Sequence, residues 1–252
     1  MCGKELLIGD FMVKSLVLRV DGTNCAHETV IALELAGSNV TLAHINQLIR
    51  GMVDLEDYHA LIIPGGFSFG DHIAAGKIIA NYLKIRLKKE IKRFIETNKP
   101  ILGICNGFQA LLKSGFLDTD ATLLTNESGF FIDTWVKLKK VADSIFTNGI
   151  ETLFIPINHG EGKFYADEAT LKRLVRQERI VLKYIDNPNG SYEDIAGIIN
   201  EMGNVMGLMP HPEKFVHYYT HPYWTRLTQE ERRNEGEGLL IFKNLVKACE
   251  KL

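Results

Sequence analysis

The first 115 residues alternate short apolar runs with longer segments of helical periodicity, and this alternation limits the fold more than any other feature of the sequence. The runs "SLVLRV" (residues 15–20) and "VTLAHI" (40–45) are rich in β-branched residues, and a helical segment (26–36) separates them. Strands that alternate with helices in this way form parallel βαβ units. The pattern predicts an α/β fold with a doubly wound, mostly parallel central sheet.

The alternation continues as far as Gly115. Two further apolar runs, "ALIIPGG" (60–66) and "ILGIC" (101–105), have the length and composition of buried strands. Between them, apolar residues at four-residue spacing predict one long surface helix over residues 77–98, which Pro100 ends. The last helical segment, "NGFQALLKSG", stops at Gly115, a residue type that favours the end of a helix.

Residues 130–207 are less regular and contain four strand-like runs, "TWVKLKK", "TLFIPI", "RIVLKYI" and "IAGIIN", separated by turn signals such as "DNPNGS". We expect these strands either on the same sheet or in a small sheet beside it. Neither an internal repeat nor a linker-like segment interrupts the chain, so the sequence favours a single domain over residues 1–252.

Charge and composition disfavour several kinds of partner. The 252 residues include 29 Lys and Arg against 31 Asp and Glu, so the chain lacks the basic surface that nucleic acid or anionic lipid selects. No apolar run approaches the roughly 20 residues that span a bilayer, and the N-terminus lacks a signal peptide. We therefore expect a cytoplasmic protein with no nucleic-acid partner and no membrane partner. The absence of a C-x-x-C pair predicts free thiols and no metal site, the four cysteines being Cys2, Cys25, Cys105 and Cys249.

The segment "GICNG" (103–107) places Cys105 between two glycines where a predicted strand meets a predicted helix. This is the cysteine form of the G-x-S-x-G nucleophile elbow. Small neighbours permit the sharp turn, and the N-terminus of a helix favours the thiolate over the thiol. Cys105 is therefore a candidate nucleophile, although a buried structural cysteine fits this segment equally well.

A cysteine nucleophile needs a base and a residue that orients the base. In "MPHPEK", His211 and Glu213 are two residues apart, so in an extended segment both side chains point to the same side. The carboxylate could then orient the imidazole and stabilise its charge. His217 and His221 lie in a polar, aromatic-rich tail where a surface role fits better. We expect His211 as base and Glu213 as its orienting residue, with an ordinary loop histidine as the alternative.

The segment "IIPGGFSFGD" (62–71) ends a strand with two glycines, whose backbone amides can approach a ligand closely. It has neither the Gly-Lys-Ser/Thr of a P-loop nor the spacing of a dinucleotide-binding loop. An acyl-transfer site needs amides that point at the tetrahedral oxygen. The N–H groups of Gly66 and Asn106 would supply two such donors, and a tight structural turn is the alternative.

These segments resemble the class I (triad-type) glutamine amidotransferases, in which Cys, His and Glu follow in this order. The closer resemblance is to the glutaminase subunits of phosphoribosylformylglycinamidine synthase. The similarity covers nearly the whole chain, and "GGFSFGD", "NHGEGKF" and "DNPNGS-x-x-x-IAGI" are specific to those subunits. Residues 115–150 and 217–237 match less well, and Asp21 in "VDGTNC" stands where the family usually has proline.

The resemblance implies a flavodoxin-like three-layer sandwich with helices on both faces of the sheet. It also implies that Cys105 attacks the side-chain amide of L-glutamine, releases ammonia and leaves a thioester for water to hydrolyse, with His211 as base and then acid. In related enzymes the segment that corresponds to "NHG" contributes largely through its backbone, so a structural role for His159 is equally compatible. The resemblance places four residues at the glutamine pocket: Gly65, Ser68, Gln109 and His159.

The chain has no nucleotide-binding motif, although making an amidine from an amide requires ATP. The resemblance implies no cofactor on this chain, and ATP and magnesium on a synthetase partner that converts formylglycinamide ribonucleotide to formylglycinamidine ribonucleotide in purine biosynthesis. It also implies an enclosed path for ammonia and a small bridging subunit. We expect the isolated chain to hydrolyse glutamine poorly until its partners order the loop near Gly66. Cys25 is expected to be structural, and the charged segment 225–237 receives no role.

Two other functions remain open on the sequence alone. A glutaminase subunit of a different complex, such as a GMP-forming or pyridoxal-phosphate-forming synthase, would keep the triad and change the docking surface. A non-enzymatic regulatory module on the same fold would have no chemical need for Cys105, His211 and Glu213 together, which disfavours that function.

Overall fold

The computed structural model describes residues 12–71, 73–233 and 235–252. Among these residues the main element is a nine-stranded sheet in the order β2-β1-β3-β4-β11-β10-β9-β6-β7. Its first five strands run parallel to one another, which confirms the doubly wound parallel core. These strands are β2 (Asn39–His44), β1 (Lys14–Arg19), β3 (Ala60–Ile63), β4 (Ile101–Ile104) and β11 (Val205–Leu208).

The other four strands of the sheet are antiparallel to their neighbours. They are β10 (Ile195–Ile199), β9 (Ile180–Tyr184), β6 (Ile132–Lys140) and β7 (Thr152–His159), and each of them overlaps one of the four strand-like runs of the sequence. A separate two-stranded sheet, which those runs do not predict, pairs β5 (Thr122–Thr125) with β8 (Glu161–Tyr165). The irregular second half of the chain therefore extends the main sheet and adds a small one.

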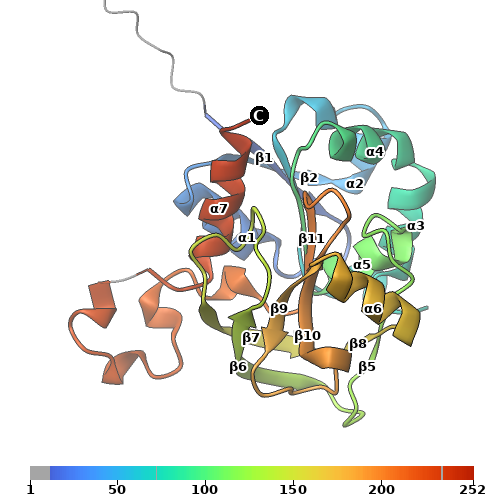
Figure 1. The fold of residues 1–252 in the computed structure, drawn as a ribbon. Coiled ribbons are helices and arrows are strands. Elements are labelled where there is room, and N and C mark those ends of the chain that lie inside the picture. Colours follow the sequence, from blue (N-terminus) through green and yellow to red (C-terminus); the bar gives the residue numbers. More distant parts are fainter. Residues whose placement is uncertain (1–11, 72, 234) are drawn as a thin grey trace, which may run out of the picture.

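Helices cover both faces of the sheet (Figure 1). α1 (Ala26–Leu35) and α7 (Leu239–Cys249) pack together on one face, and α3 (Lys77–Ile85) and α5 (Asn106–Ser114) pack together on the other. This confirms the three-layer arrangement. The remaining α-helices of the described residues are α2 (Ile45–Ile49), α4 (Lys88–Glu96) and α6 (Glu168–Arg176). None of the helices in these ranges has the length and apolar character that crossing a membrane requires.

The prediction of one long helix over residues 77–98 is wrong, because the segment forms two helices, α3 and α4. The N–H groups of Arg86 and Leu87 both donate to the carbonyl oxygen of Tyr82, at 2.9 and 3.2 Å, which ends α3. Leu87 leaves helical geometry (φ −118°, ψ 16°) while its side chain stays buried. Four-residue spacing identified the buried face correctly, but burial of Leu87 is compatible with a break at that residue.

Short 3₁₀ turns connect many of these elements. Residues 217–233, which include three of them, project from the body of the molecule beside α7 (Figure 1). The turns lie at Leu55–Asp57, Ser68–Asp71, Tyr192–Asp194, Pro212–Lys214, Tyr218–Thr220, Trp224–Arg226 and Glu231–Arg233.

The parallel strands place the chemistry-bearing segments at one edge of the sheet. The carboxyl ends of parallel strands share an edge, and ligands of α/β sheets bind outside it. β1 leads there to residues 20–25, β3 to residues 64–71 and β4 to Cys105. β11 leads to residues 209–213 at the same edge.

Candidate active site

Cys105 occupies a strained turn between β4 and α5. Its φ of 50° and ψ of −103° lie in a region that residues with side chains rarely adopt. A Cβ atom on Gly107 would overlap the carbonyl oxygen of Ile63, and one on Gly103 would lie 2.5 Å from a methyl carbon of Leu111. Both glycines of "GICNG" are therefore needed for close approach of the chain to itself, as the nucleophile-elbow interpretation requires.

His211 and Glu213 form a buried hydrogen-bonded pair. His211 Nδ1 lies 2.6 Å from Glu213 Oε1, and both residues are almost fully buried. The backbone N–H of His211 donates to the carbonyl oxygen of Pro156 on β7, at 2.8 Å. The segment is not extended throughout, because residues 212–214 form a 3₁₀ turn, yet the two side chains meet.

The charges around His211 favour its protonated form. Burial alone would lower the pKa of this imidazole, but the Glu213 carboxylate and the Cys105 thiol outweigh burial and raise the pKa well above 6.5. A Cβ atom added to Gly65 would lie 2.7 Å from His211 Cε1 and 3.4 Å from Cys105 Cβ, so Gly65 lies against both side chains. The protonated imidazole of His211 therefore lies beside the Cys105 side chain.

A cavity of about 170 Å³ opens beside Cys105. Its small volume suits a ligand of amino-acid size better than a drug-sized ligand, which needs roughly 300–1,000 Å³. Of the four residues predicted at the glutamine pocket, Gln109 and His159 line it, and Gly66, a predicted oxyanion donor, lines it as well. The amide of Gln109 is held by Asn106 Nδ2, which donates to Gln109 Oε1 at 2.9 Å, and by the Glu161 carbonyl oxygen, which accepts from Gln109 Nε2 at 2.6 Å.

Gly65 and Ser68 are not among the residues that line this cavity. The Ser68 hydroxyl donates to Asn106 Oδ1, and the Ser68 N–H donates to the same oxygen at 3.3 Å. Asn106 Nδ2 also donates to Asp71 Oδ1, at 3.2 Å. Ser68 thus connects the loop after β3 to the first residue of α5 through hydrogen bonds.

Both predicted oxyanion donors lie next to Cys105. Gly66 lines the cavity and has a φ of 144°, and its position leaves no room for a Cβ atom, which would lie 2.5 Å from the backbone nitrogen of Asn24. Asn106 follows Cys105 as the first residue of α5. Its backbone N–H is therefore one of the donors that an α-helix leaves without an intrahelical acceptor.

His159 is held as a neutral, packed imidazole. Its Nδ1 lies 3.0 Å from Asn126 Oδ1, and a Cβ atom on Gly162 would overlap the ring. Burial, followed by the nearby charge of His211, lowers the pKa of His159 to about 4. This environment supports a positioning role for the side chain as well as for its backbone.

Three further residues near the site were not singled out as site residues by the sequence. The Cys105 Sγ lies 3.7 Å from the backbone carbonyl oxygen of Asn158, the first residue of "NHG", whose backbone was expected to contribute. Phe131 lines the cavity but lies in a region of weak family resemblance. The Cys25 Sγ lies 3.9 Å from His211 Nδ1. Cys25 has no base beside it in the sequence, and only the fold supplies one.

Cys25, His211 and Glu213 also place three possible metal-ligand atoms within 4.8 Å of one another. Two atoms bound to a tetrahedral zinc ion are about 3.3 Å apart, given metal–ligand distances near 2.0 Å. The 2.6 Å contact between His211 and Glu213 is shorter and is a hydrogen bond between the two. The geometry therefore fits a histidine–carboxylate pair better than a zinc site.

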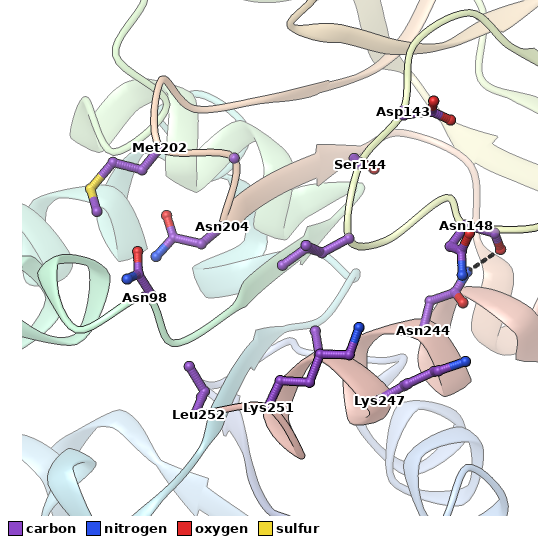
Figure 2. Close-up of a pocket in the computed structure, with 13 residues that line it drawn as sticks. Asn98, Asp143, Ser144, Asn148, Met202, Asn204, Asn244, Lys247, Lys251 and Leu252 are labelled. Carbon is purple, nitrogen blue, oxygen red and sulfur yellow. Dashed lines mark hydrogen bonds between the residues drawn. The ribbon is translucent and has the colours of Figure 1, made fainter.

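A much larger cavity, of about 780 Å³, lies at the opposite edge of the sheet (Figure 2). Asn98 precedes β4 and Asn204 precedes β11, so this cavity is at the amino ends of the parallel strands. Lys247 and Lys251 of the C-terminal part also line it, but no cysteine or histidine does. It lacks a cysteine with a histidine–carboxylate pair, so the smaller cavity beside Cys105 is the candidate active site.

The two histidines of the tail lie outside this site. The ring of His217 stacks on Tyr219, with centroids 4.8 Å apart. The ring of His221 packs against those of Trp135 and Phe154, at 5.7 and 5.6 Å. Cys2 lies outside the described residues. Cys249 is buried at the end of α7.

Comparisons with known proteins agree with this geometry. The sequence matches the CobB/CobQ-like glutamine amidotransferase domain over residues 12–249. It is 41% identical to the phosphoribosylformylglycinamidine synthase subunit PurQ of Dehalococcoides mccartyi, over 93% of this chain and 97% of that relative. It is 38% identical to the PurQ subunit of Methanococcus maripaludis strain C7, over 92% of this chain and 96% of that relative.

Solved structures agree with the sequence comparisons. A chain in the structure of PurLQS from Thermotoga maritima is similar with a TM-score of 0.76 and 34% identity, over 94% of this chain and 98% of that chain. A putative GMP synthase protein from Thermoplasma acidophilum, with a TM-score of 0.59 and 17% identity over 95% of each chain, shares the fold alone. The chain therefore belongs to the CobB/CobQ-like glutamine amidotransferases and, within them, to the PurQ subunits of phosphoribosylformylglycinamidine synthase.

Proposed function

We propose that this PurQ-type subunit hydrolyses L-glutamine through a Cys105 thioester and delivers the ammonia to a synthetase partner. The partner converts formylglycinamide ribonucleotide to formylglycinamidine ribonucleotide in purine biosynthesis. One observation carries the proposal. The Cys105 thiol sits on a strained strand-to-helix turn, and the His211 imidazole beside it is paired with the buried Glu213 carboxylate.

The first half of the reaction forms the thioester. The Cys105 thiolate attacks the side-chain carbonyl carbon of glutamine, and the backbone N–H groups of Gly66 and Asn106 stabilise the negative oxygen of the tetrahedral intermediate. The His211 imidazolium then donates its proton to the departing nitrogen. The carbon–nitrogen bond breaks, ammonia leaves, and a glutamyl thioester remains on Cys105.

The second half regenerates the enzyme. Neutral His211 takes a proton from water as the water oxygen attacks the thioester carbon. The carbon–sulfur bond breaks, and glutamate leaves with the thiolate and the imidazolium restored. Glu213 holds the imidazole in one orientation and stabilises its charge without changing its own protonation. Glutamine and water thus become glutamate and ammonia, and no cofactor on this chain takes part.

The cavity beside Cys105 is the proposed glutamine pocket. Gln109 lines it with an amide that two hydrogen bonds hold in place, and we assign this residue a contact with the substrate. His159 lines the same cavity as a neutral group. Gly65 and Ser68 act indirectly, because Gly65 leaves space for the His211 imidazole and Ser68 is hydrogen-bonded to Asn106.

Exposed aromatic side chains support a partner at the mouth of the cavity. Phe67 and Phe131 line the cavity, and their rings lie 6.1 Å apart. Phe67, Phe130 and Phe131 are 50%, 76% and 52% exposed, which is unusual for neighbouring large apolar groups on a surface without a partner. A synthetase chain that covers these rings would keep ammonia away from water.

The proposed complex includes that synthetase, which would bind ATP and magnesium, and a small bridging subunit. The setting is cytoplasmic. Phe67 follows Gly66 in the loop and is half-exposed at the cavity, so we expect slow hydrolysis of glutamine by this chain until its partners bind this loop. No nucleic acid or membrane enters the proposed activity.

The test is glutamate release from glutamine. The purified chain is assayed alone and with the synthetase, the bridging protein, ATP, magnesium and formylglycinamide ribonucleotide, and Cys105→Ala is assayed in parallel. We expect release to rise strongly in the complete complex and to disappear with Cys105→Ala. Glutamine left intact by a verified complete complex would contradict the proposed function, and equal rates with and without partners would contradict the gating.

A further inference from the structure

The turn between β1 and α1, residues 21–25, is hydrogen-bonded to the loop after β3 that carries Gly66. The N–H of Phe67 donates to the Gly22 carbonyl oxygen at 2.9 Å, and the N–H of Phe69 donates to the Asp21 carbonyl oxygen at 2.8 Å. In the opposite direction, the N–H of Cys25 donates to the Gly65 carbonyl oxygen at 3.2 Å. Because β1 and β3 are neighbours in the sheet, these two segments lie side by side.

Two glycines allow the turn and the loop to interlock. Gly22 has a φ of 86°, and a Cβ atom on it would overlap the carbonyl oxygen of Phe67. Gly66 faces it from the loop, and a Cβ atom there would lie 2.6 Å from the Gly22 carbonyl oxygen. At Gly22 and Gly66 the backbone of the loop therefore packs directly against the backbone of the turn, and the Asn24 side-chain oxygen also accepts from the N–H of Phe67, at 3.4 Å.

The same turn reaches the imidazole through Cys25. Its Sγ lies 3.9 Å from His211 Nδ1, the ring nitrogen that is hydrogen-bonded to Glu213. Cys25 is buried and does not line the cavity beside Cys105. The backbone of Cys25 is itself fixed, because its carbonyl oxygen accepts from the hydroxyl of Thr29 at 2.7 Å.

We propose that residues 21–25 are a positioning element that sets the loop of Gly66 through Gly22 and the imidazole of His211 through Cys25. The inference rests on the proposed glutaminase function. Cys25 is a positioning residue, because it lies on the Glu213 side of the ring and away from the substrate cavity. A sulfur atom is a weak hydrogen-bond acceptor. Contact with Nδ1 limits rotation of the ring and keeps Nε2 available to Cys105.

The loop contact is tested with Gly22→Ala and a matched control, Gly37→Ala. Gly37 has a similar φ of 93° and no atom within 4 Å of an added Cβ, so both variants impose the same left-handed strain and only Gly22→Ala displaces the loop. We expect kcat of the complete complex to fall about 100-fold in Gly22→Ala, the scale of a misplaced catalytic group. Gly37→Ala should stay within about twofold. Equal kcat in the two variants would overturn this contact.

The imidazole contact is tested with Cys25→Ala and Cys25→Ser. We expect kcat to fall about tenfold in Cys25→Ala with KM unchanged, and Cys25→Ser to recover most of the loss, because a hydroxyl also accepts a hydrogen bond. The groups that face His211 are Glu213, Cys105, Cys25 and His159. Contact with Cys25 raises the pKa of the imidazole, so the high-pH limb of kcat/KM should move to lower pH in Cys25→Ala.

Each outcome decides between the proposals. An unchanged pH limb in Cys25→Ala, or a serine variant no more active than the alanine variant, would overturn the role of Cys25. Activity retained by Cys105→Ala in the same assay would instead contradict the glutaminase mechanism. If Gly22→Ala does not fold, Cys25→Ala and Cys25→Ser still test the positioning element. Both substitutions are small and do not change the backbone of the turn.

Discussion

The two edges of the central sheet differ in how tightly the chain packs. At the carboxyl edge, Cys105 has a positive φ, and Gly65 and Gly66 lie where a Cβ atom would meet neighbouring atoms, around a cavity of about 170 Å³. At the amino edge, a cavity of about 780 Å³ is lined by asparagine and lysine side chains. The reactive groups therefore line the smaller of the two cavities, and cavity size is a poor guide to the site.

The edges differ in hydrogen bonding as well. Among the described residues, five buried side-chain atoms have no hydrogen-bond partner, and three of them, His159 Nε2, His211 Nε2 and Glu213 Oε2, belong to the candidate site. At the amino edge, the amide of Asn204 donates to the Ile95 carbonyl oxygen at 2.8 Å, and that of Asn244 donates to the Asn148 carbonyl oxygen at 2.8 Å (Figure 2). Unpaired buried groups need an explanation. For His211 and Glu213, the explanation is the proton transfer and charge stabilisation proposed for them.

The largest expected effect separates two buried cysteines. Cys105→Ala should lower glutamate release by the complete complex at least ~10⁴-fold, as expected when a nucleophile is removed. Cys249→Ala is the control, because burial raises the pKa of the Cys249 thiol to about 12 and keeps it unreactive. The control should retain activity and lose some thermal stability. Comparable losses of activity would contradict the assignment of Cys105.

The next effect concerns the carboxylate that orients the base. Glu213→Gln should lower kcat about 100-fold, because the imidazolium loses its charge partner and its fixed orientation. The carboxylate raises the pKa of His211, so its loss should move the high-pH limb of kcat/KM to lower pH. Glu235→Gln, which removes an exposed carboxylate paired with Lys243, is the control and should leave the profile unchanged. An unchanged high-pH limb of kcat/KM in Glu213→Gln would contradict the proposed role of the His211–Glu213 pair.

A smaller effect is expected in the pH dependence of stability. The pKa of His159 is about 4 in the folded protein and 6.5 in a free histidine, so the unfolded chain binds the proton more tightly. Stability should therefore fall as pH drops from 6.5 towards 4, by at most about 3 kcal/mol from this group. Denaturant unfolding of His159→Gln should show a weaker dependence in that range. The control is His27→Gln at an exposed position, whose unfolding free energy should depend on pH as in the wild type. The same pH dependence in the wild type and both variants would refute the contribution of His159.

The smallest effects are expected at the amino edge. Asn244→Ala leaves two carbonyl oxygens, of Phe146 and Asn148, without their donor and should cost about 1–3 kcal/mol of unfolding free energy. Lys247→Ala removes an exposed charge and should change stability by less than about 0.5 kcal/mol. Both variants should keep wild-type glutamate release. A loss of glutamate release in either variant without a loss of stability would indicate a function for this cavity and would contradict the difference described between the two edges.

Sequence patterns predicted the local parts of the site well. "GICNG" indicated a strained turn at Cys105 because the glycines that permit such a turn are adjacent in the chain. "HPE" indicated the His211–Glu213 pair for the same reason, although the turn that brings them together is 3₁₀ rather than extended. The prediction of one long helix over 77–98 was wrong, because the spacing of apolar residues shows which residues are buried and not where the chain bends.

The parts of the site that the sequence missed are contacts between distant segments. Ser68 was expected in the glutamine pocket, and its hydrogen bond to Asn106, 38 positions away, is visible only in the structure. Phe131 comes from a region of weak resemblance and reaches the cavity only through the fold. No local pattern predicts either contact, because each joins residues that only the sheet brings together.

Cys25 shows where prediction from the sequence stops. Periodicity and short motifs were enough to predict the parallel core, the elbow at Cys105 and the family. That the end of β1 lies beside the end of β3, and that Cys25 contacts the imidazole of His211 from 186 positions away, is visible only in the folded chain. Side-chain periodicity encodes which residues are buried, whereas contacts across the sheet depend on the order of the strands.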